Sequence, residues 1–154
     1  MTEYTAVALT TFFATIGPID VATMFAAFTV ATPRRERRRI AVKACLIALA
    51  ILITFALIGR FMLDSLGISL AALRAAGGIL LLLIGIDMVF GKGSSANSTT
   101  DEEAEEAADR EDISVFPVAT PLIAGPGAMG ATILLMADQQ GHVEGQLIVL
   151  GALV

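Results

Sequence analysis

The hydrophobic positions of this chain fall into long runs that are separated by short polar or charged connections. A helix needs about 20 apolar residues to cross the hydrocarbon core of a bilayer. Four runs are long enough for a complete span, and a fifth begins near the end of the chain: residues 4–31, 40–63, 68–90, 113–137 and 145–154. The pattern therefore predicts an all-α, polytopic transmembrane helical bundle with four complete spans and the start of a fifth.

Two of these runs are interrupted near their middle by glycine and proline. Gly17-Pro18 divides the first run, and Gly125-Pro126-Gly127 divides the fourth, 108 residues later. Proline removes a backbone donor and clashes with the preceding helical turn, and glycine accepts the resulting dihedral angles. Because successive spans alternate in direction, the two broken helices are antiparallel, which is typical of an inverted-topology repeat. The predicted units are a first three-helix repeat (1–91), a connecting loop (92–112) and the start of a second repeat (113–154).

The paired breaks are the candidate binding site. Backbone groups freed at mid-membrane are costly unless they face protein or a wet cavity, so two breaks at one depth favour a shared cavity. The helix N-termini after each proline would present N–H groups to a carboxylate or another anion. Asp20 either caps its helix or meets an ammonium group or coupling ion, and two threonines offer hydroxyls. The predicted substrate-binding residues are Gly17, Pro18, Asp20, Thr23, Gly125, Pro126, Gly127 and Thr132. The simpler interpretation is that each Gly-Pro is an ordinary kink, of the kind that many transmembrane helices contain.

The composition agrees with a membrane protein. Of the 154 residues, 56% are hydrophobic and 16% are charged, whereas soluble domains are usually about a quarter charged. The net charge of −5 comes from one connection, because residues 92–112 contain eight acidic and two basic side chains. This Ser-rich and Glu-rich connection predicts a disordered acidic loop. No basic face for a nucleic acid is left elsewhere.

The basic residues predict the orientation of the chain. Five arginines crowd the first connection at positions 34, 35, 37, 38 and 39. Short loops rich in Lys and Arg stay in the cytoplasm, and acidic residues contribute little to this rule. We therefore expect a multi-pass protein of the cell membrane with its N-terminus outside and both the arginine cluster and the acidic loop inside.

The residue types within the runs favour a carrier over an enzyme. Intramembrane hydrolases need a catalytic set such as Ser with His or paired Asp, and the runs hold none. We expect no catalytic residue, no metal and no cofactor. The expected partners are the lipid bilayer, a small zwitterionic or neutral solute, a coupling ion and further copies in a homo-oligomer. The alternative is a non-transport membrane scaffold or signalling partner, which would use the small residues near Gly78 and Gly85 to pack against another helix.

Four stretches of the sequence resemble the MarC family of membrane proteins. They are FFATIGPIDVATMF, RIAVKACLIALAILITFALIG after the arginine cluster, GISLAALRAAGGILLLLIGIDM and ISVFPVATPLIAGPGAM. The resemblance covers nearly the whole chain. It implies six transmembrane helices, a distant relation to LysE-type exporters and, from some relatives, transport of neutral amino acids. With six spans expected, any functional form should have a complete fifth and sixth span beyond the run that stops at Val154.

The chain departs from the family pattern at the first break. The family usually has Asn or Asp before the first proline, where this chain has Gly17, and a small residue where this chain has Asp20. An acidic side chain has thus moved by three positions, which is almost one helical turn. The resemblance therefore leaves the identity of the substrate open.

Overall fold

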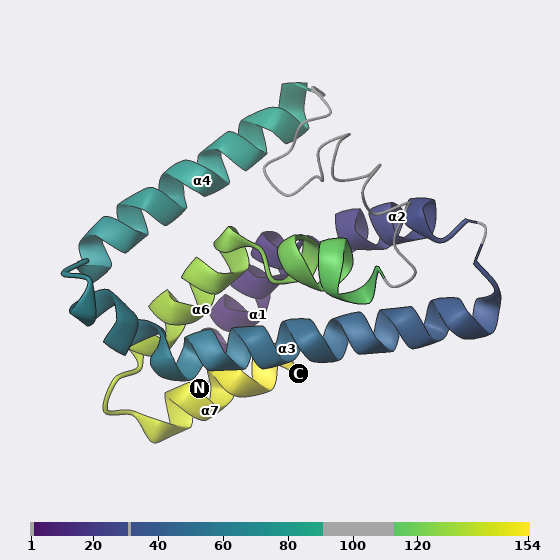
Figure 1. Ribbon diagram of the computed structural model, residues 1–154. Helices are drawn as coiled ribbons and strands as arrows, with labels where there is room; N and C mark the ends of the chain where they lie inside the picture. Colours follow the sequence, from purple (N-terminus) through teal and green to yellow (C-terminus); the bar gives the residue numbers. More distant parts are fainter. Residues whose placement is uncertain (1, 31, 91–112) are drawn as a thin grey trace.

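The computed structural model describes residues 2–30, 32–90 and 113–154 (Figure 1). Every regular element in these ranges is helical, which confirms the predicted all-α class. The acidic loop predicted over 92–112 lies outside the described residues. The elements in chain order are α1 (Thr2–Ile16), α2 (Pro18–Phe28), α3 (Arg34–Ser65), α4 (Leu70–Phe90), η1 (Ser114–Ile123), α6 (Pro126–Asp138) and α7 (Val143–Leu153).

The long helix α3 is the axis of the fold. Its 32 residues correspond to about 48 Å at about 1.5 Å per residue, which exceeds a hydrocarbon core of about 30 Å. The helices η1, α6 and α7 all contact it. The helix begins at Arg34 after an N-cap at Pro33, so the arginine cluster forms its first turns and the helix starts six residues before the predicted position. Arginine is a good helix former, and proline just before the first turn is readily accommodated.

Small side chains on α3 allow the second broken helix to approach closely. The buried positions of α3 recur at intervals of about four residues: Ala44, Ala48, Leu52, Ala56, Gly59 and Leu63. At Gly59 the approach is close, since a Cβ atom added there would lie 2.5 Å from Cγ1 of Ile133 in α6. Small residues at such an interface are what membrane helices use to pack without lipid between them.

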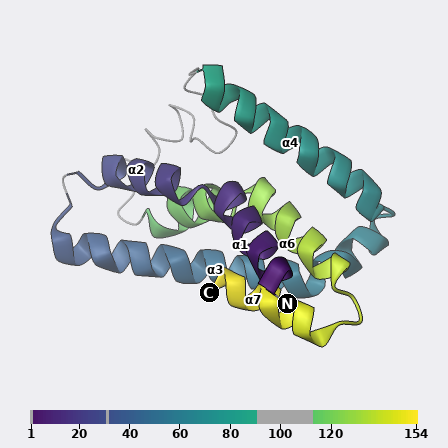
Figure 2. The ribbon, with the colours of Figure 1, turned by 180° about the vertical axis from the view of Figure 1, so that it is seen from behind.

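A second apolar cluster joins the N-terminal helix to the C-terminal one. Helix α1 packs on α6 and α7, and the three lie together in both views (Figures 1 and 2). The Tyr4 hydroxyl donates a hydrogen bond of 2.9 Å to the carbonyl of Leu135. The buried side chains of this cluster are Ala8, Phe12, Ala56, Leu135, Met136 and Val149.

Helix α4 stands apart from this core. It contacts α6, and much of its length projects away from the other helices in both views (Figures 1 and 2). Arg74 of α4 forms an ion pair with Asp138 at the end of α6. Both members of this pair are about half exposed, and pairs of this kind contribute at most about 1 kcal/mol.

Several described helices are apolar enough for a membrane. Glu3–Phe28 and Arg34–Ser65 are each long enough to cross it, and η1 with α6 forms a third candidate that is bent by 56°. The apolar helix Val143–Leu153 is shorter than the roughly 20 residues that a span needs. Helix α4 has 21 residues, and its first part, Leu70–Leu80, is apolar as well. By length and composition two described helices are long enough to cross a membrane, or three spans result if the bent pair is one span, and α4 has the length of the run predicted over 68–90.

Candidate functional site

The first run is broken at a single residue. Helix α1 ends at Ile16, Pro18 is the first residue of α2, and Gly17 between them has φ 59° and ψ 59°. This left-handed conformation costs a residue with a Cβ atom about 1–2 kcal/mol, so glycine is the residue that suits it. Hydrogen bonds continue on both sides, from the Gly17 amide to the Phe13 carbonyl (3.1 Å) and from the Val21 amide to the Gly17 carbonyl (3.0 Å). The break is therefore a narrow interruption, located at the predicted residues.

The second run is broken over a longer stretch. Helix α6 begins at Pro126 after an extended Gly125, and η1 before it is itself irregular. Phe116 and Thr120 have extended dihedral angles inside η1, each directly before a proline, and both of these peptide bonds are cis. Proline disfavours the helical region for the residue that precedes it. The sequence predicted one helix over 113–137 with a central break. That prediction is wrong for the first half of the run, where the backbone is irregular.

The halves of the two broken helices pair crosswise. Helix α1 packs against α6, and α2 packs against η1, as Figures 1 and 2 also indicate. Ile16, at the first break, contacts the buried cluster that contains Ala124 and Ala128, on either side of the second. Both α2 and α6 therefore begin near the middle of the unit that the two broken helices form together. The first N–H groups of each have no partner within their own helix, and they carry the positive end of the helix dipole.

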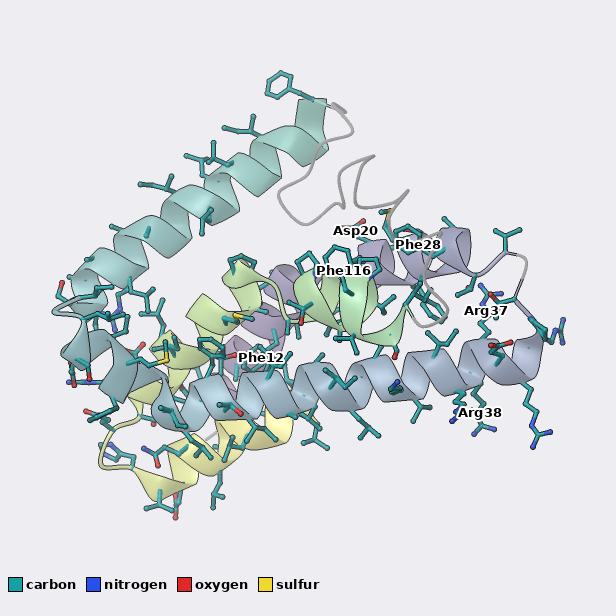
Figure 3. The ribbon with its side chains drawn as sticks, viewed as in Figure 1. Phe12, Asp20, Phe28, Arg37, Arg38 and Phe116 are labelled. Atoms are coloured by element: carbon teal, nitrogen blue, oxygen red, sulfur yellow. The ribbon has the colours of Figure 1, made fainter. Side chains whose placement is uncertain are left out.

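Asp20 and Thr23 lie on the first turns of α2, and both side chains are exposed. Asp20 extends on the side of α2 away from α3 (Figure 3). Its Oδ2 atom lies 3.4 Å from the position of a Cβ atom added to Gly17, so the carboxylate stands beside the break. No side chain caps the Gly17 end of α2. The Thr23 hydroxyl donates to the carbonyl of Asp20 (2.8 Å), which leaves its oxygen able to accept a further hydrogen bond.

The predicted residues of the second break differ in exposure. Gly125 is buried, Pro126 is exposed and Gly127 is intermediate. Thr132 lies further along α6 and is fully buried, and its hydroxyl donates to the Ala128 carbonyl (2.7 Å). The structure therefore places six of the eight predicted residues at or next to a break, with Thr23 further along α2 and exposed and Thr132 further along α6 and buried.

Sequence reasoning missed three further buried hydroxyl groups, those of Thr15, Thr29 and Ser114. Thr15 donates to the Thr11 carbonyl (2.8 Å), and Thr29 to the Phe25 carbonyl (2.6 Å). Isolated threonines in apolar helices commonly bond to the carbonyl four residues earlier. The sequence therefore held no signal that separated them from Thr23 or Thr132.

Among the described residues, no group of three or more His, Cys, Asp or Glu side chains is placed to hold a metal ion. A cavity does occur along the first half of α3, and its described lining contains none of the eight predicted residues. The chemistry available at the two breaks is thus one carboxylate, two helix N-termini and hydroxyl acceptors.

Comparisons with known proteins give one consistent result. A family model described as "MarC family integral membrane protein" matches residues 2–154. A UPF0056 membrane protein of Methanocaldococcus jannaschii is 38% identical over 152 residues, which cover 99% of this chain and 73% of the relative. A second one from that organism is 36% identical and covers 92% of this chain and 61% of its own length. A UPF0056 membrane protein of Bacillus subtilis is 33% identical over 92% of this chain and 68% of the relative. The chain thus spans 61–73% of the length of these relatives, and no solved structure matches it.

Proposed function

Because the chain belongs to the MarC family of integral membrane proteins, we propose that it is a small-solute carrier of the cell membrane. The observation that supports this is the crosswise pairing of the broken helices, α1 with α6 and α2 with η1. This pairing brings the N-terminal ends of α2 and α6 to the middle of the unit that the four half-helices form. Interrupted helices in antiparallel repeats are a common device for binding a solute near the membrane midplane.

The proposed solute is a neutral amino acid or a similar zwitterion. Its carboxylate would accept hydrogen bonds from the N–H groups at the starts of α2 and α6, where the helix dipole favours negative charge. Its ammonium group would meet Asp20, whose carboxylate stands beside Gly17. The glycines and prolines of the two breaks would interrupt the helical hydrogen bonding and leave backbone groups available to the solute: Gly17, Pro18, Gly125, Pro126 and Gly127.

The two threonines would add hydroxyl acceptors to this site. Thr23 is exposed on the same turns as Asp20. Thr132 is buried, so it would be the deepest and weakest contributor. A coupling ion would share the carboxylate of Asp20 with the solute.

A membrane scaffold is the second candidate, and α4 supports it. Gly77, Gly78 and Gly85 on this helix have no atom within 4 Å of an added Cβ position, so the helix offers an open surface on which another helix, from a partner or a second copy, would pack closely. A scaffold needs no open site at the helix breaks, which separates it from a carrier.

The deciding experiment is flux of labelled alanine in proteoliposomes. Pro18→Ala and Pro126→Ala restore a backbone donor and straighten the helices, and we expect each to lower flux at least tenfold. Asp20→Asn should weaken alanine binding more than binding of propionate, which lacks the ammonium group. Asp64→Asn is the matched control, because this exposed carboxylate pairs with Arg60 at the end of α3. Flux that is absent in the unaltered protein, or unchanged in both proline variants, would contradict the carrier.

We also propose that the arginine-rich start of α3 lies in the cytoplasm and the N-terminus outside. The test is thiol labelling of Arg34→Cys in intact cells, in a Cys45→Ser background because Cys45 is an exposed free thiol. We expect labelling only after permeabilisation. Ready labelling of intact cells by an impermeant reagent would reverse the orientation.

A further inference from the structure

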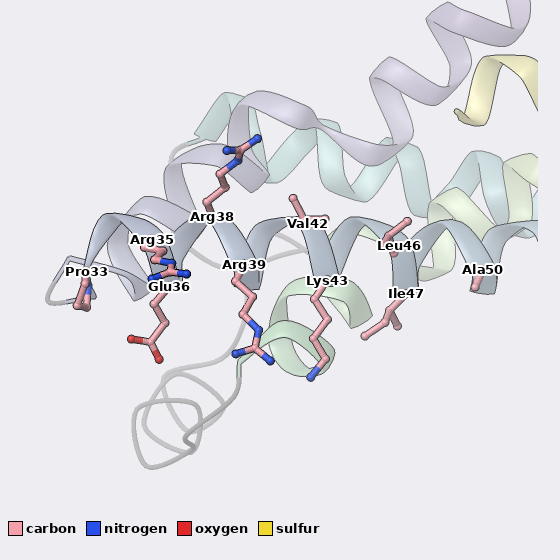
Figure 4. A pocket seen from close by; sticks show the side chains of 10 residues that line it. All are labelled: Pro33, Arg35, Glu36, Arg38, Arg39, Val42, Lys43, Leu46, Ile47 and Ala50. Atoms are coloured by element: carbon pink, nitrogen blue, oxygen red, sulfur yellow. The ribbon is translucent and has the colours of Figure 1, made fainter.

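The cavity on α3 differs in kind from the site at the helix breaks. Its volume is about 1210 Å³, above the ~300–1,000 Å³ of ordinary small-molecule pockets. The described residues that line it follow the first half of α3 (Figure 4): Pro33, Arg35, Glu36, Arg38, Arg39, Val42, Lys43, Leu46, Ile47 and Ala50. We call this cavity the α3 groove. Its size suits a ligand larger than an amino acid.

The lining of the α3 groove changes from charged to apolar along the helix axis. Arg35, Arg38, Arg39 and Lys43 occupy the charged half, with Glu36 as the one acidic side chain among the described lining residues. The other half is made of aliphatic side chains, of which Val42 (53% accessible) and Leu46 (62%) are well exposed, whereas Ile47 is partly buried against the core. A ligand that fits both halves therefore carries negative charge at one end and a hydrocarbon chain at the other.

The part of the groove from Arg39 to its apolar end at Ala50 has the length of a lipid leaflet. Arg39 and Ala50 are 11 residues apart, which is about 16 Å along a helix. One leaflet is half of a hydrocarbon core of about 30 Å. When the arginines lie at the headgroup level, Ala50 therefore lies near the bilayer midplane.

We infer that the α3 groove binds an anionic phospholipid, with its phosphate on the arginines and an acyl chain along Val42, Leu46 and Ile47. Guanidinium groups bind phosphate oxygens in a planar, bidentate geometry. Clusters of Lys and Arg at the cytoplasmic end of a membrane helix attract anionic lipids, so this step rests on the cytoplasmic position proposed above for the start of α3. A free phosphate would leave the apolar half of the groove without a ligand.

The arginine cluster itself supplies the controls. Arg37 is turned toward α2, with its guanidinium carbon 5.8 Å from the centre of the Phe25 ring, and it is not among the residues that line the groove. Arg34 also lies outside the described lining. General attraction of a basic cluster to an anionic membrane would depend equally on Arg34, Arg35 and Arg39, whereas a bound lipid depends on the two that line the groove.

The experiment measures lipid retained by the purified protein in detergent, by native mass spectrometry. With equal dioleoyl phosphatidylglycerol and dioleoyl phosphatidylcholine present, we expect the protein to retain the anionic lipid. A basic side chain near a lipid surface contributes about 1 kcal/mol, so Arg35→Gln and Arg39→Gln should each weaken retention about fivefold. Arg34→Gln should change it by less than twofold. Circular dichroism of each variant verifies that the helices remain folded.

Three results would overturn the inference. One is equal retention of phosphatidylcholine, and another is an equal loss in Arg34→Gln, which would indicate general electrostatic attraction. The third is displacement of the lipid by glycerol 3-phosphate at a similar concentration, since this headgroup analogue has no acyl chain. Failure of alanine flux would leave all three results unaffected, so this test is independent of the proposed carrier function.

Discussion

The two broken helices differ in how firmly the rest of the protein holds them. Both halves of the second one, η1 and α6, contact α3, and α6 alone buries Ala128, Thr132, Ile133, Leu135 and Met136. The second half of the first broken helix is α2, which contacts η1 and contains no buried residue. The same Gly-Pro pair thus precedes a half-helix that is packed into the core at the second break and one without a buried residue at the first.

This difference suggests a division of roles. A half-helix that buries little apolar surface has little packing energy to lose when it moves. The second break therefore suits a fixed part of the site, and α2 with Asp20 suits a part that adjusts to the solute or to the ion. Three tests of this comparison follow, in order of decreasing expected effect.

The largest effect should come from separating α6 from α3. Gly59→Val would place atoms where Ile133 now lies, 2.5 Å from the new Cβ position, and overpacking of this kind costs about 1–3 kcal/mol. We expect a loss near the upper value, measured by denaturant unfolding in detergent and followed by circular dichroism. Gly78→Val is the control, because an added Cβ in α4 has no atom within 4 Å.

A double variant would show that the contact itself is responsible. Ile133→Ala removes the side chain that Gly59→Val meets, so the two changes should together cost less than the sum of their separate effects. Strictly additive losses, or an equal loss in Gly78→Val, would show that the second broken helix is not anchored at this contact.

The next effect concerns the backbone at the first break. Gly17→Ala puts a Cβ atom on a residue with φ 59°, and the left-handed conformation then costs about 1–2 kcal/mol. Gly127→Ala is the matched control, since it lies in the first turn of α6 with open space around the added atom and should be neutral or slightly stabilising. Equal unfolding free energies for both variants would mean that α2 re-forms without the left-handed residue.

The sequence predicted the fold class and the position of both breaks, because these depend on local properties. Run length predicts helices that suit a membrane, and the Gly-Pro pairs coincide with the ends of α1 and η1. The irregular backbone of η1 could also have been predicted, since Pro117 and Pro121 restrict the residues before them. Its actual path, with Phe116 and Thr120 extended, was missed because the apolar run was interpreted as one helix.

Contacts between segments that are distant along the chain could not be predicted from the sequence. The partner of Arg74 is Asp138, 64 residues away along the chain, and no periodicity or spacing connects them. The burial of Thr132 and the exposure of Thr23 also depend on which face of α6 and of α2 packs against the other helices. Two threonines with similar local sequence thus received the same predicted role, although their surroundings differ.

The smallest effect should separate these two threonines, and it tests the comparison within the site. Thr23→Val removes an exposed hydroxyl whose oxygen is still able to accept a hydrogen bond. One hydrogen bond is worth about 0.5–1.5 kcal/mol, so alanine affinity should fall by about two- to tenfold. Thr132→Val keeps the shape of a fully buried side chain whose proton already bonds to Ala128, so affinity should change by less than twofold. Isothermal titration of alanine into each detergent-purified variant measures both values, and Thr23→Ser should restore the unaltered affinity. A larger loss in Thr132→Val than in Thr23→Val would place the solute deep against α6, and α2 would then lose its proposed role as the adjustable part of the site.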